Sequence, residues 1–221
     1  MDTEFWKERW GKDETGFHLD KPNPALVNHW HTMPVDLGTR VLVPLCGKSV
    51  DIIWFLKEGY QVVGAELSEK ALDALAYDIE GEFGLAVDKQ EVDGLILYRA
   101  AGILLICGDW FALTARDIGP VDAVYDRAAL VALPPQMRVD YSQHLLNISR
   151  NAPQLLVSFA YDQNQMSGPP FSVPEDEVIA HYGSLMHADV LDDRELIDHE
   201  PRFRERGVTS MRQAVYRLTP R

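Results

Sequence analysis

Short apolar runs alternate with longer amphipathic stretches along most of this chain, and this alternation constrains the fold more than any other feature. Five apolar runs have the length of buried strands: residues 40–46, 61–66, 103–107, 121–126 and 155–160. Four stretches between or after them have helical spacing of apolar residues: 49–58, 68–79, 134–150 and 175–182. Strands that alternate with helices form βαβ units around a parallel sheet. The sequence therefore predicts an α/β fold with helices on both faces of its sheet.

Two segments depart from this alternation. Residues 80–102 contain four glycines and many acids, and residues 95–98 could pair with 103–107 as a hairpin, so we interpret 80–102 as an insertion. Near the end, apolar runs at 185–191 and 213–219 predict a closing antiparallel pair. No repeat or long linker divides the chain, so we expect one domain over residues 1–221.

The charge balance excludes several classes of partner. The 221 residues include 21 Lys+Arg and 34 Asp+Glu, for a formal net charge of −13. Because nucleic-acid affinity comes mostly from basic side chains that displace counterions, we expect no nucleic acid or anionic membrane as a partner. No apolar run approaches the roughly 18–20 residues that a membrane-spanning helix needs. The first residues are charged and aromatic, unlike a signal peptide, so we expect a cytoplasmic protein.

The cysteines and histidines predict no metal site. The two cysteines, Cys46 and Cys107, are expected to be reduced and buried thiols in a chain without an export signal. The seven histidines are scattered, and neither Cys-x-x-Cys nor His-x-x-x-His spacing occurs.

A glycine turn follows the first predicted strand, where open α/β sheets bind ligands. Its sequence, Leu45-Cys-Gly-Lys-Ser49, looks at first like the end of a phosphate-binding loop. That loop needs a glycine five positions before Gly47, and this position is Leu42, inside the strand. The turn also lacks the GxGxxG spacing of dinucleotide-binding proteins. It therefore disfavours nucleotide hydrolysis.

Two acids at predicted strand ends favour a nucleoside ligand. Glu66 lies nineteen residues after Gly47, where a carboxylate can accept both hydroxyl protons of a ribose; the alternative is an acid that complements a helix dipole. Asp109 and Trp110 follow the next core strand and could hold an adenine ring, although Trp110 could instead be a core residue. A nucleoside without phosphates suits S-adenosylmethionine better than NAD or ATP.

Several blocks of this sequence resemble the thiopurine S-methyltransferases of bacterial type, which are class I S-adenosylmethionine-dependent enzymes. The resemblance covers nearly the whole chain, and its PLCGK and DRAALVA blocks are specific to the family. The blocks are WKERW at 6–10, GFH at 16–18, VPLCGK at 43–48, VVGAE at 62–66, YDRAALV at 125–131, GPPF at 168–171 and VP at 173–174.

The resemblance implies a Rossmann-like fold with a seven-stranded, mostly parallel sheet that contains one antiparallel strand. It also implies S-adenosylmethionine as cofactor and S-adenosylhomocysteine as product. The expected cofactor contacts are Trp10, Leu45, Gly47, Glu66, Asp109, Trp110 and Arg127.

An aromatic N-terminal segment, residues 1–35, is expected to act as a lid. Trp10 in this segment could cover the cofactor's sulfonium through a cation–π contact, and the alternative for such aromatics is core packing. Arg127 is expected to orient an anionic acceptor; the alternative is an ion pair with Asp126 or Asp109. Asp20 and His18 are weak candidates for a catalytic base.

The acceptor pocket is expected to include Phe17, His18, Pro170 and Arg202, although the segments that carry Pro170 and Arg202 could equally be surface loops. Cys46 is not expected to accept a methyl group if its thiol faces the sheet.

The resemblance implies a detoxifying enzyme that methylates small thiols or thiopurine-type compounds, with selenium and tellurium species as further candidate acceptors. We expect a monomer, because no extra apolar helix indicates an obligate dimer. Two alternatives stay open. One is a methyltransferase for halide, thiocyanate or a similar small anion, and the other is a module that binds S-adenosylmethionine without turnover.

Overall fold

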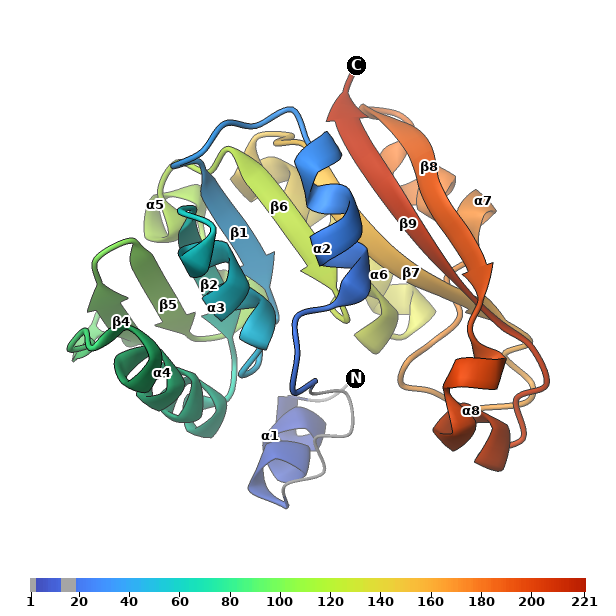
Figure 1. Ribbon diagram of the computed structural model, residues 1–221, viewed down its shortest axis with the longest axis horizontal. Coiled ribbons are helices and arrows are strands. Elements are labelled where there is room, and N and C mark those ends of the chain that lie inside the picture. Colours follow the sequence, from blue (N-terminus) through green and yellow to red (C-terminus); the bar gives the residue numbers. More distant parts are fainter. Residues whose placement is uncertain (1–2, 13–18) are drawn as a thin grey trace.

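The computed structural model describes residues 3–12 and 19–221. Within these residues nine strands form one sheet in the order β3-β4-β5-β2-β1-β6-β7-β9-β8 (Figure 1). The strands are β1 (Arg40–Pro44), β2 (Gln61–Glu66), β3 (Asp88–Val92), β4 (Leu95–Ala100), β5 (Ile103–Cys107), β6 (Ala123–Arg127), β7 (Gln154–Tyr161), β8 (Met186–Glu195) and β9 (Met211–Pro220). The five predicted core strands are all present, as β1, β2, β5, β6 and β7.

The predicted strand number was wrong, because the described chain forms nine strands rather than seven. The central strands β5, β2, β1, β6 and β7 are parallel, whereas β4 and β9 each run antiparallel to both neighbours. Two strands are therefore reversed where one was expected. Residues 80–102 account for part of the difference, since they form the hairpin β3–β4 that extends the sheet beyond β5. The short turn between β3 and β4 leaves no room for the crossover that a parallel pairing needs.

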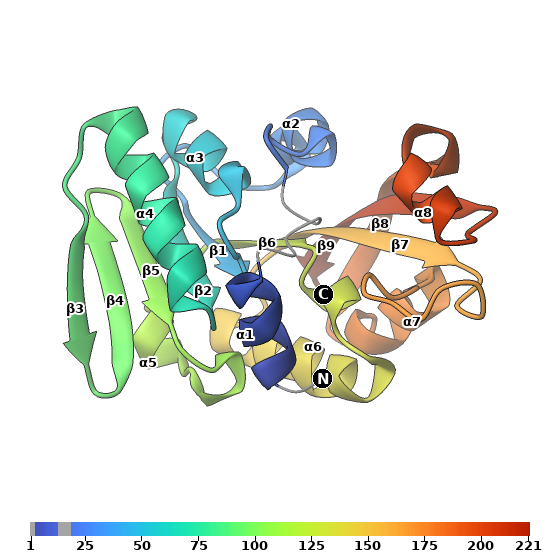
Figure 2. The same cartoon turned by 90° about the horizontal axis from the view of Figure 1, so that it is seen from below.

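Helices cover both faces of the sheet, as predicted (Figure 2). On one face lie α2 (Pro24–His29), α3 (Val50–Lys57) and α4 (Glu69–Phe83). On the other lie α5 (Ala115–Ile118), α6 (Pro135–Ser149) and α7 (Glu175–Tyr182). Strand β1 shows why both layers of helices are needed, because its apolar side chains point to both faces of the sheet. Leu42 packs in the cluster that contains Leu145 of α6, and its neighbours Val41 and Val43 pack with Phe55 of α3.

Two serines begin the helices that follow β1 and β2. Ser49 caps α3 by accepting a hydrogen bond from the amide of Asp51, and Ser68 caps α4 by accepting one from the amide of Ala71. Helix α4 ends at Phe83, four residues beyond the predicted end at residue 79. Gly84, whose φ is 64°, caps this end. Both capped ends lie where β1 and β2 end, which brings their backbone amides to one edge of the sheet.

Smaller elements complete the two ends of the molecule. Helix α1 (Thr3–Gly11) lies at the carboxyl ends of the central strands (Figure 2), and α8 (Pro201–Glu205) packs through Phe203 in a separate small cluster. The described residues also form four 3-10 helices: η1 (Trp30–Thr32), η2 (Trp110–Ala112), η3 (Leu130–Ala132) and η4 (Ile197–His199).

The predicted closing pair is present as the antiparallel strands β8 and β9, and residues 162–174 form a loop.

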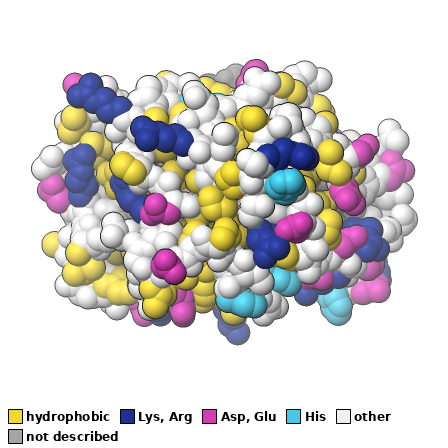
Figure 3. Space-filling model, turned by 90° about the horizontal axis from the view of Figure 1, so that it is seen from above, with side chains coloured by type: hydrophobic (Ala, Val, Ile, Leu, Met, Phe, Trp, Pro, Cys, Tyr) yellow, Lys and Arg dark blue, Asp and Glu magenta, His cyan; other side chains and the backbone are white. Residues whose placement is uncertain are grey.

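The view from above shows basic, acidic and apolar side chains mixed over this face (Figure 3). None of the helices in the described part of the chain is both long and apolar enough to cross a bilayer.

Candidate active site

A cavity of about 340 Å³ opens at the carboxyl ends of the parallel strands. This volume lies in the range of small-molecule sites, about 300–1,000 Å³, and the location is the usual one in open α/β sheets. Nine of the predicted site residues line it: Trp10, Leu45, Gly47, Glu66, Asp109, Trp110, Arg127, Pro170 and Arg202. Residues far apart in the sequence thus meet around one space.

The turn after β1 is shaped around a tryptophan ring. Leu45 and Gly47 both have positive φ, at 46° and 54°. A Cβ atom on Gly47 would lie 2.8 Å from Cζ2 of Trp10, closer than side-chain contacts allow. Glycine is therefore required here for two reasons, its backbone conformation and its contact with Trp10. The buried Trp10 ring in turn forms a cavity wall against the turn.

Glu66 holds the turn and the start of α4 together. Its Oε2 accepts a 2.9 Å hydrogen bond from the amide of Gly47, and its Oε1 accepts bonds of 2.8 Å from the amides of Leu67 and Ser68. Burial raises the pKa of Glu66, and these three amides oppose that rise. A carboxylate offers about four acceptor positions, so one stays available to a ligand hydroxyl. The bonds from Leu67 and Ser68 agree with the role at a helix start that was considered for this acid, and its contact with a ribose stays a prediction.

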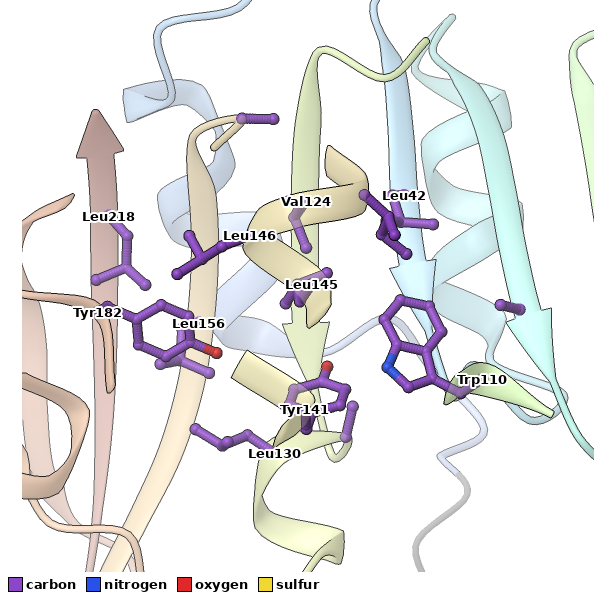
Figure 4. Packing of buried hydrophobic residues seen from close by; sticks show 14 of the residues in the cluster. Leu42, Trp110, Val124, Leu130, Tyr141, Leu145, Leu146, Leu156, Tyr182 and Leu218 are labelled. Carbon is purple, nitrogen blue, oxygen red and sulfur yellow. The ribbon is translucent and has the colours of Figure 1, made fainter. Parts of the chain in front are cut away.

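Asp109 and Trp110 lie side by side but differ in environment. Asp109 is exposed and caps η2 by accepting a 3.1 Å hydrogen bond from the amide of Phe111. Trp110 is buried, and its ring lies 5.7 Å from Tyr141 and 5.5 Å from His144, between centroids. Figure 4 shows the Trp110 ring directed into this core. Trp110 is therefore both a core residue and part of the cavity wall.

Arg127, the last residue of β6, lines the cavity. Its neighbour Asp126 is fully buried and is not among the cavity residues of the described chain. The carboxylate of Asp126 accepts hydrogen bonds from the Tyr141 hydroxyl, at 2.8 Å, and the Leu130 amide, at 3.2 Å. Burial raises the pKa of Asp126 to about 6. Ala128 follows with a φ of 66°, a costly conformation for a residue with a side chain. Like Leu45 after β1, Ala128 shows backbone strain at the cavity wall, and such strain is typical of functional sites.

Asp51 and Tyr125 are among the cavity residues that the sequence analysis did not name as site residues. Asp51 is 1% exposed, and its Oδ2 accepts a 2.9 Å hydrogen bond from the Tyr125 hydroxyl. Its Oδ1 accepts a 2.7 Å bond from the amide of Asn23, which caps α2. The signal that the sequence offered for Asp51 was its position as an acid among the apolar residues of segment 49–58.

The far side of the cavity is formed by the loop that contains Pro169 and Pro170, and by Arg202, Phe203 and Arg206 of the α8 region. Arg202 pairs with Glu200 at 2.8 Å. Sequence reasoning named Pro170 and Arg202 here, and the other three residues lie in the two segments that it assigned to the acceptor pocket.

The remaining candidates do not join this group. Asp20 is exposed and is not among the cavity residues of the described chain. Phe17 and His18 lie outside the described residues.

Cys46 is poorly suited to act as a nucleophile. Burial and the nearby Glu66 raise the pKa of its thiol well above the usual value, so the thiol stays protonated at neutral pH. Its Sγ lies against Gly64 of β2, toward the sheet. Within residues 3–12 and 19–221, no group of three or more His, Cys, Asp or Glu side chains could hold a metal ion.

A family model described as thiopurine S-methyltransferase matches residues 1–221. The chain belongs to the thiopurine S-methyltransferase family. A thiopurine S-methyltransferase of Pseudomonas fluorescens is 42% identical over 218 residues, with 99% of each chain covered. One from Bordetella petrii is 43% identical over 219 residues, with 99% of this chain and 98% of the relative covered.

Solved structures support the fold that the thiopurine S-methyltransferase family implies. The 1,6-didemethyltoxoflavin-N1-methyltransferase of Burkholderia thailandensis, solved with S-adenosylhomocysteine, has a TM-score of 0.63 and 15% identity over 98% of this chain and 87% of that one. A S-adenosylmethionine-dependent methyltransferase of Anabaena variabilis has a TM-score of 0.59 and 14% identity over 97% and 94%. The expected class I methyltransferase fold and the S-adenosylmethionine cofactor are confirmed.

The cavity fits this cofactor in its chemistry. Glu66 offers an acceptor for ribose hydroxyls, and the buried Trp10 ring offers an aromatic face for a cationic centre.

Proposed function

We propose that this protein methylates the sulfur of a small thiol or thiopurine-type acceptor within this cavity, with selenium or tellurium species as further acceptors. One observation supports this above all: a single cavity joins the turn at Gly47 and Glu66 to a far wall that contains Arg127, Pro170 and Arg202. The first side suits the cofactor, and the second offers basic groups and apolar surface to an anionic, planar acceptor.

S-adenosylmethionine supplies an electrophilic methyl group when bound. The role of the chain is then to bind, orient and dry the two reactants. Arg127 favours the thiolate form of the acceptor, because a nearby positive charge lowers the pKa of an acid. Trp10 closes the cavity at α1 and excludes water from the cofactor side.

This proposal assigns no catalytic base to the described residues. Aromatic thiols and thiones lose their proton near neutral pH, so positioning contributes more than proton abstraction. Asp20 is exposed and is not among the cavity residues, although its neighbour Leu19 is, so no contact with the cavity supports it as the base.

Two other functions predict different results. A methyltransferase for small anions would methylate iodide or thiocyanate in preference to an aromatic thiol. A sensor would bind the cofactor without any product. The apolar far wall favours the planar acceptor over a small anion.

The test combines calorimetry with product detection. We expect binding of S-adenosylmethionine and S-adenosylhomocysteine, and a methylated product with an aromatic thiol or a thiopurine. Binding without product from any thiol, selenide, tellurite or halide would leave the sensor. Product from halide or thiocyanate alone would support the small-anion enzyme.

A further inference from the structure

A buried arginine lies behind the far wall of the cavity. Arg138 is 1% exposed and lies in the first turns of α6. Its Nε donates a 2.8 Å hydrogen bond to the carbonyl of Leu133, and its Nη1 donates a 3.0 Å bond to the carbonyl of Ser172. The same Nη1 pairs with Oε1 of Glu177 in α7, at 2.5 Å. One guanidinium therefore joins three separate segments.

Two of these segments form the cavity wall. Leu133 lines the cavity directly, at the end of a stretch that includes Val131 and Ala132. Ser172 follows the loop whose Pro169 and Pro170 line an adjoining part of the wall. Arg138 thus fixes the two stretches relative to each other without contacting the cavity itself.

Side-chain hydrogen bonds also hold the loop at several other carbonyls. Its two prolines have no amide hydrogen to donate. Instead, side chains donate to successive carbonyls: Arg206 to Pro169 at 3.4 Å, Tyr161 to Pro170 at 2.7 Å, Arg138 to Ser172, and Ser158 to Val173 at 2.6 Å. Side chains from three different segments therefore hold the loop in place.

A backbone hydrogen bond also ties the loop to the stretch that contains Val131 and Leu133. The amide of Phe171 donates a 2.6 Å hydrogen bond to the carbonyl of Val131, and the Phe171 ring lies 5.7 Å from the Arg138 guanidinium. Arg138 and this backbone bond bridge the same two stretches. Loss of the first is therefore expected to weaken the second.

We propose that Arg138 is a positioning residue that fixes the shape of this wall of the acceptor pocket. A buried cation is costly, and Glu177 supplies the countercharge that makes it tolerable. The planar guanidinium reaches two carbonyls in fixed directions, which the single ammonium of lysine cannot reproduce. This inference rests on the proposed function, since it assigns this side of the cavity to the acceptor.

Arg138→Lys provides the main test, with Arg99→Lys on the exposed face of β4 as the matched control. We expect Arg138→Lys to raise the KM for an aromatic thiol about tenfold, since a misplaced wall costs binding and orientation. The affinity for S-adenosylhomocysteine, measured by calorimetry, should stay within about twofold of wild type. Arg99→Lys should change neither value. An unchanged KM, or parallel losses of thiol and cofactor affinity, would overturn the assignment.

Hydrogen exchange gives a second readout that does not depend on turnover. In Arg138→Lys the Phe171 amide should exchange at least tenfold faster, while the Gly47 amide, which is held by Glu66, should keep its rate. Equal rates at Phe171 in both proteins would show that Arg138 does not hold the wall. A wild-type protein that yields no methylated thiol would contradict the proposed function, and the exchange result would still decide whether Arg138 fixes the wall.

Glu177→Gln keeps the test decisive if Arg138→Lys does not fold. This variant removes the countercharge but leaves the two carbonyl contacts of Arg138. We expect a two- to threefold rise in the thiol KM with unchanged cofactor affinity, and no change in Glu175→Gln on the exposed side of α7. A thiol KM equal to that of Glu175→Gln would contradict the proposal.

Discussion

The hydroxyl of Tyr125, in the middle of β6, donates a 2.9 Å hydrogen bond to Oδ2 of Asp51, in the first turn of α3. Both side chains are almost fully buried and both line the cavity. Because Asp51 also accepts from the Asn23 amide, this contact joins β6, α3 and the start of α2. It therefore connects the cavity wall to the segment that precedes β1.

Tyr125→Phe should lower the free energy of unfolding by about 1–3 kcal/mol, because the buried Asp51 carboxylate would lose one of its two donors. Denaturant unfolding measures this loss. Tyr77→Phe is the control, since the Tyr77 side chain is 76% exposed and the change should stay within about 0.5 kcal/mol. Equal stabilities of the two variants would show that the buried bond contributes nothing.

Gly47→Ala should reduce affinity for S-adenosylhomocysteine at least about tenfold, because the new Cβ would displace the Trp10 ring from the turn. Gly59→Ala separates this effect from backbone strain. Gly59 also has a positive φ, of 86°, but no atom lies within 4 Å of the position of a Cβ. Both variants should lose about 1–2 kcal/mol of stability from strain. Calorimetry should find the affinity loss in Gly47→Ala alone, and a similar loss in both would rule out the role of Trp10.

Glu66→Ala should lower cofactor affinity by about 1–3 kcal/mol, the range for hydrogen bonds to a charged group. Stability should fall as well, because the amides of Gly47, Leu67 and Ser68 lose their acceptor. Calorimetry with S-adenosylhomocysteine checks the first effect, and Glu58→Ala on the exposed end of α3 serves as the control. Unchanged affinity in a folded Glu66→Ala protein would remove Glu66 from the ribose contact.

Arg127→Lys should slow turnover at least about tenfold with the fold retained, since one charge-assisted hydrogen bond is worth about 1.5–3 kcal/mol. The guanidinium and the ammonium place their donors differently, so the charge alone does not rescue the rate. Steady-state kinetics with an aromatic thiol measure the change, and Arg116→Lys on the exposed side of α5 should behave as wild type. Normal kinetics for Arg127→Lys would make the residue structural.

The buried carboxyl of Asp126 predicts a pH dependence of stability. Its native pKa of about 6 lies above the ordinary value of 3.8, so the native state holds this proton to higher pH than the unfolded state. Unfolding therefore releases a proton in this range, and the contribution of Asp126 to stability falls as pH rises from about 4 through 6. The loss is on the order of 2–3 kcal/mol and is complete above about pH 7.

Asp126→Asn should remove this dependence, because its amide does not titrate. The difference in unfolding free energy between pH 5 and pH 8 should shrink in Asp126→Asn and persist in Asp140→Asn, an exposed position on α6. Identical pH profiles for wild type and Asp126→Asn would place the pKa of Asp126 near its ordinary value.

The sequence predicted the parallel centre of the sheet because those strands are continuous apolar runs, with Val41, Leu42 and Val43 buried in turn against both faces. It did not predict β3, since every residue from Asp88 to Val92 is exposed and mostly polar. The turn between β3 and β4 did carry a signal. Asp93-Gly94 is a preferred hairpin dipeptide, and both residues have the positive φ that this turn requires.

The site residues also divide into those that local sequence patterns can locate and those that depend on long-range packing. Glu66 was found because strand ends can be located from local patterns. The Tyr125–Asp51 bond spans 74 residues, and the contacts of Arg138 with Ser172 and Glu177 span 34 and 39. Such pairings depend on how helices pack across the sheet, and local patterns contain no information on that packing.

The two sides of the cavity come from separate stretches of the chain. The residues around the cofactor turn lie between Trp10 and Trp110, whereas the far wall begins at Arg127 and includes Phe159, Pro170 and Arg206 in the last third. Substitutions in that last third can therefore remodel the acceptor pocket while the donor side keeps its geometry. In a chain built in this way, the proposed acceptor side can vary in sequence without changes to the residues that form the donor side.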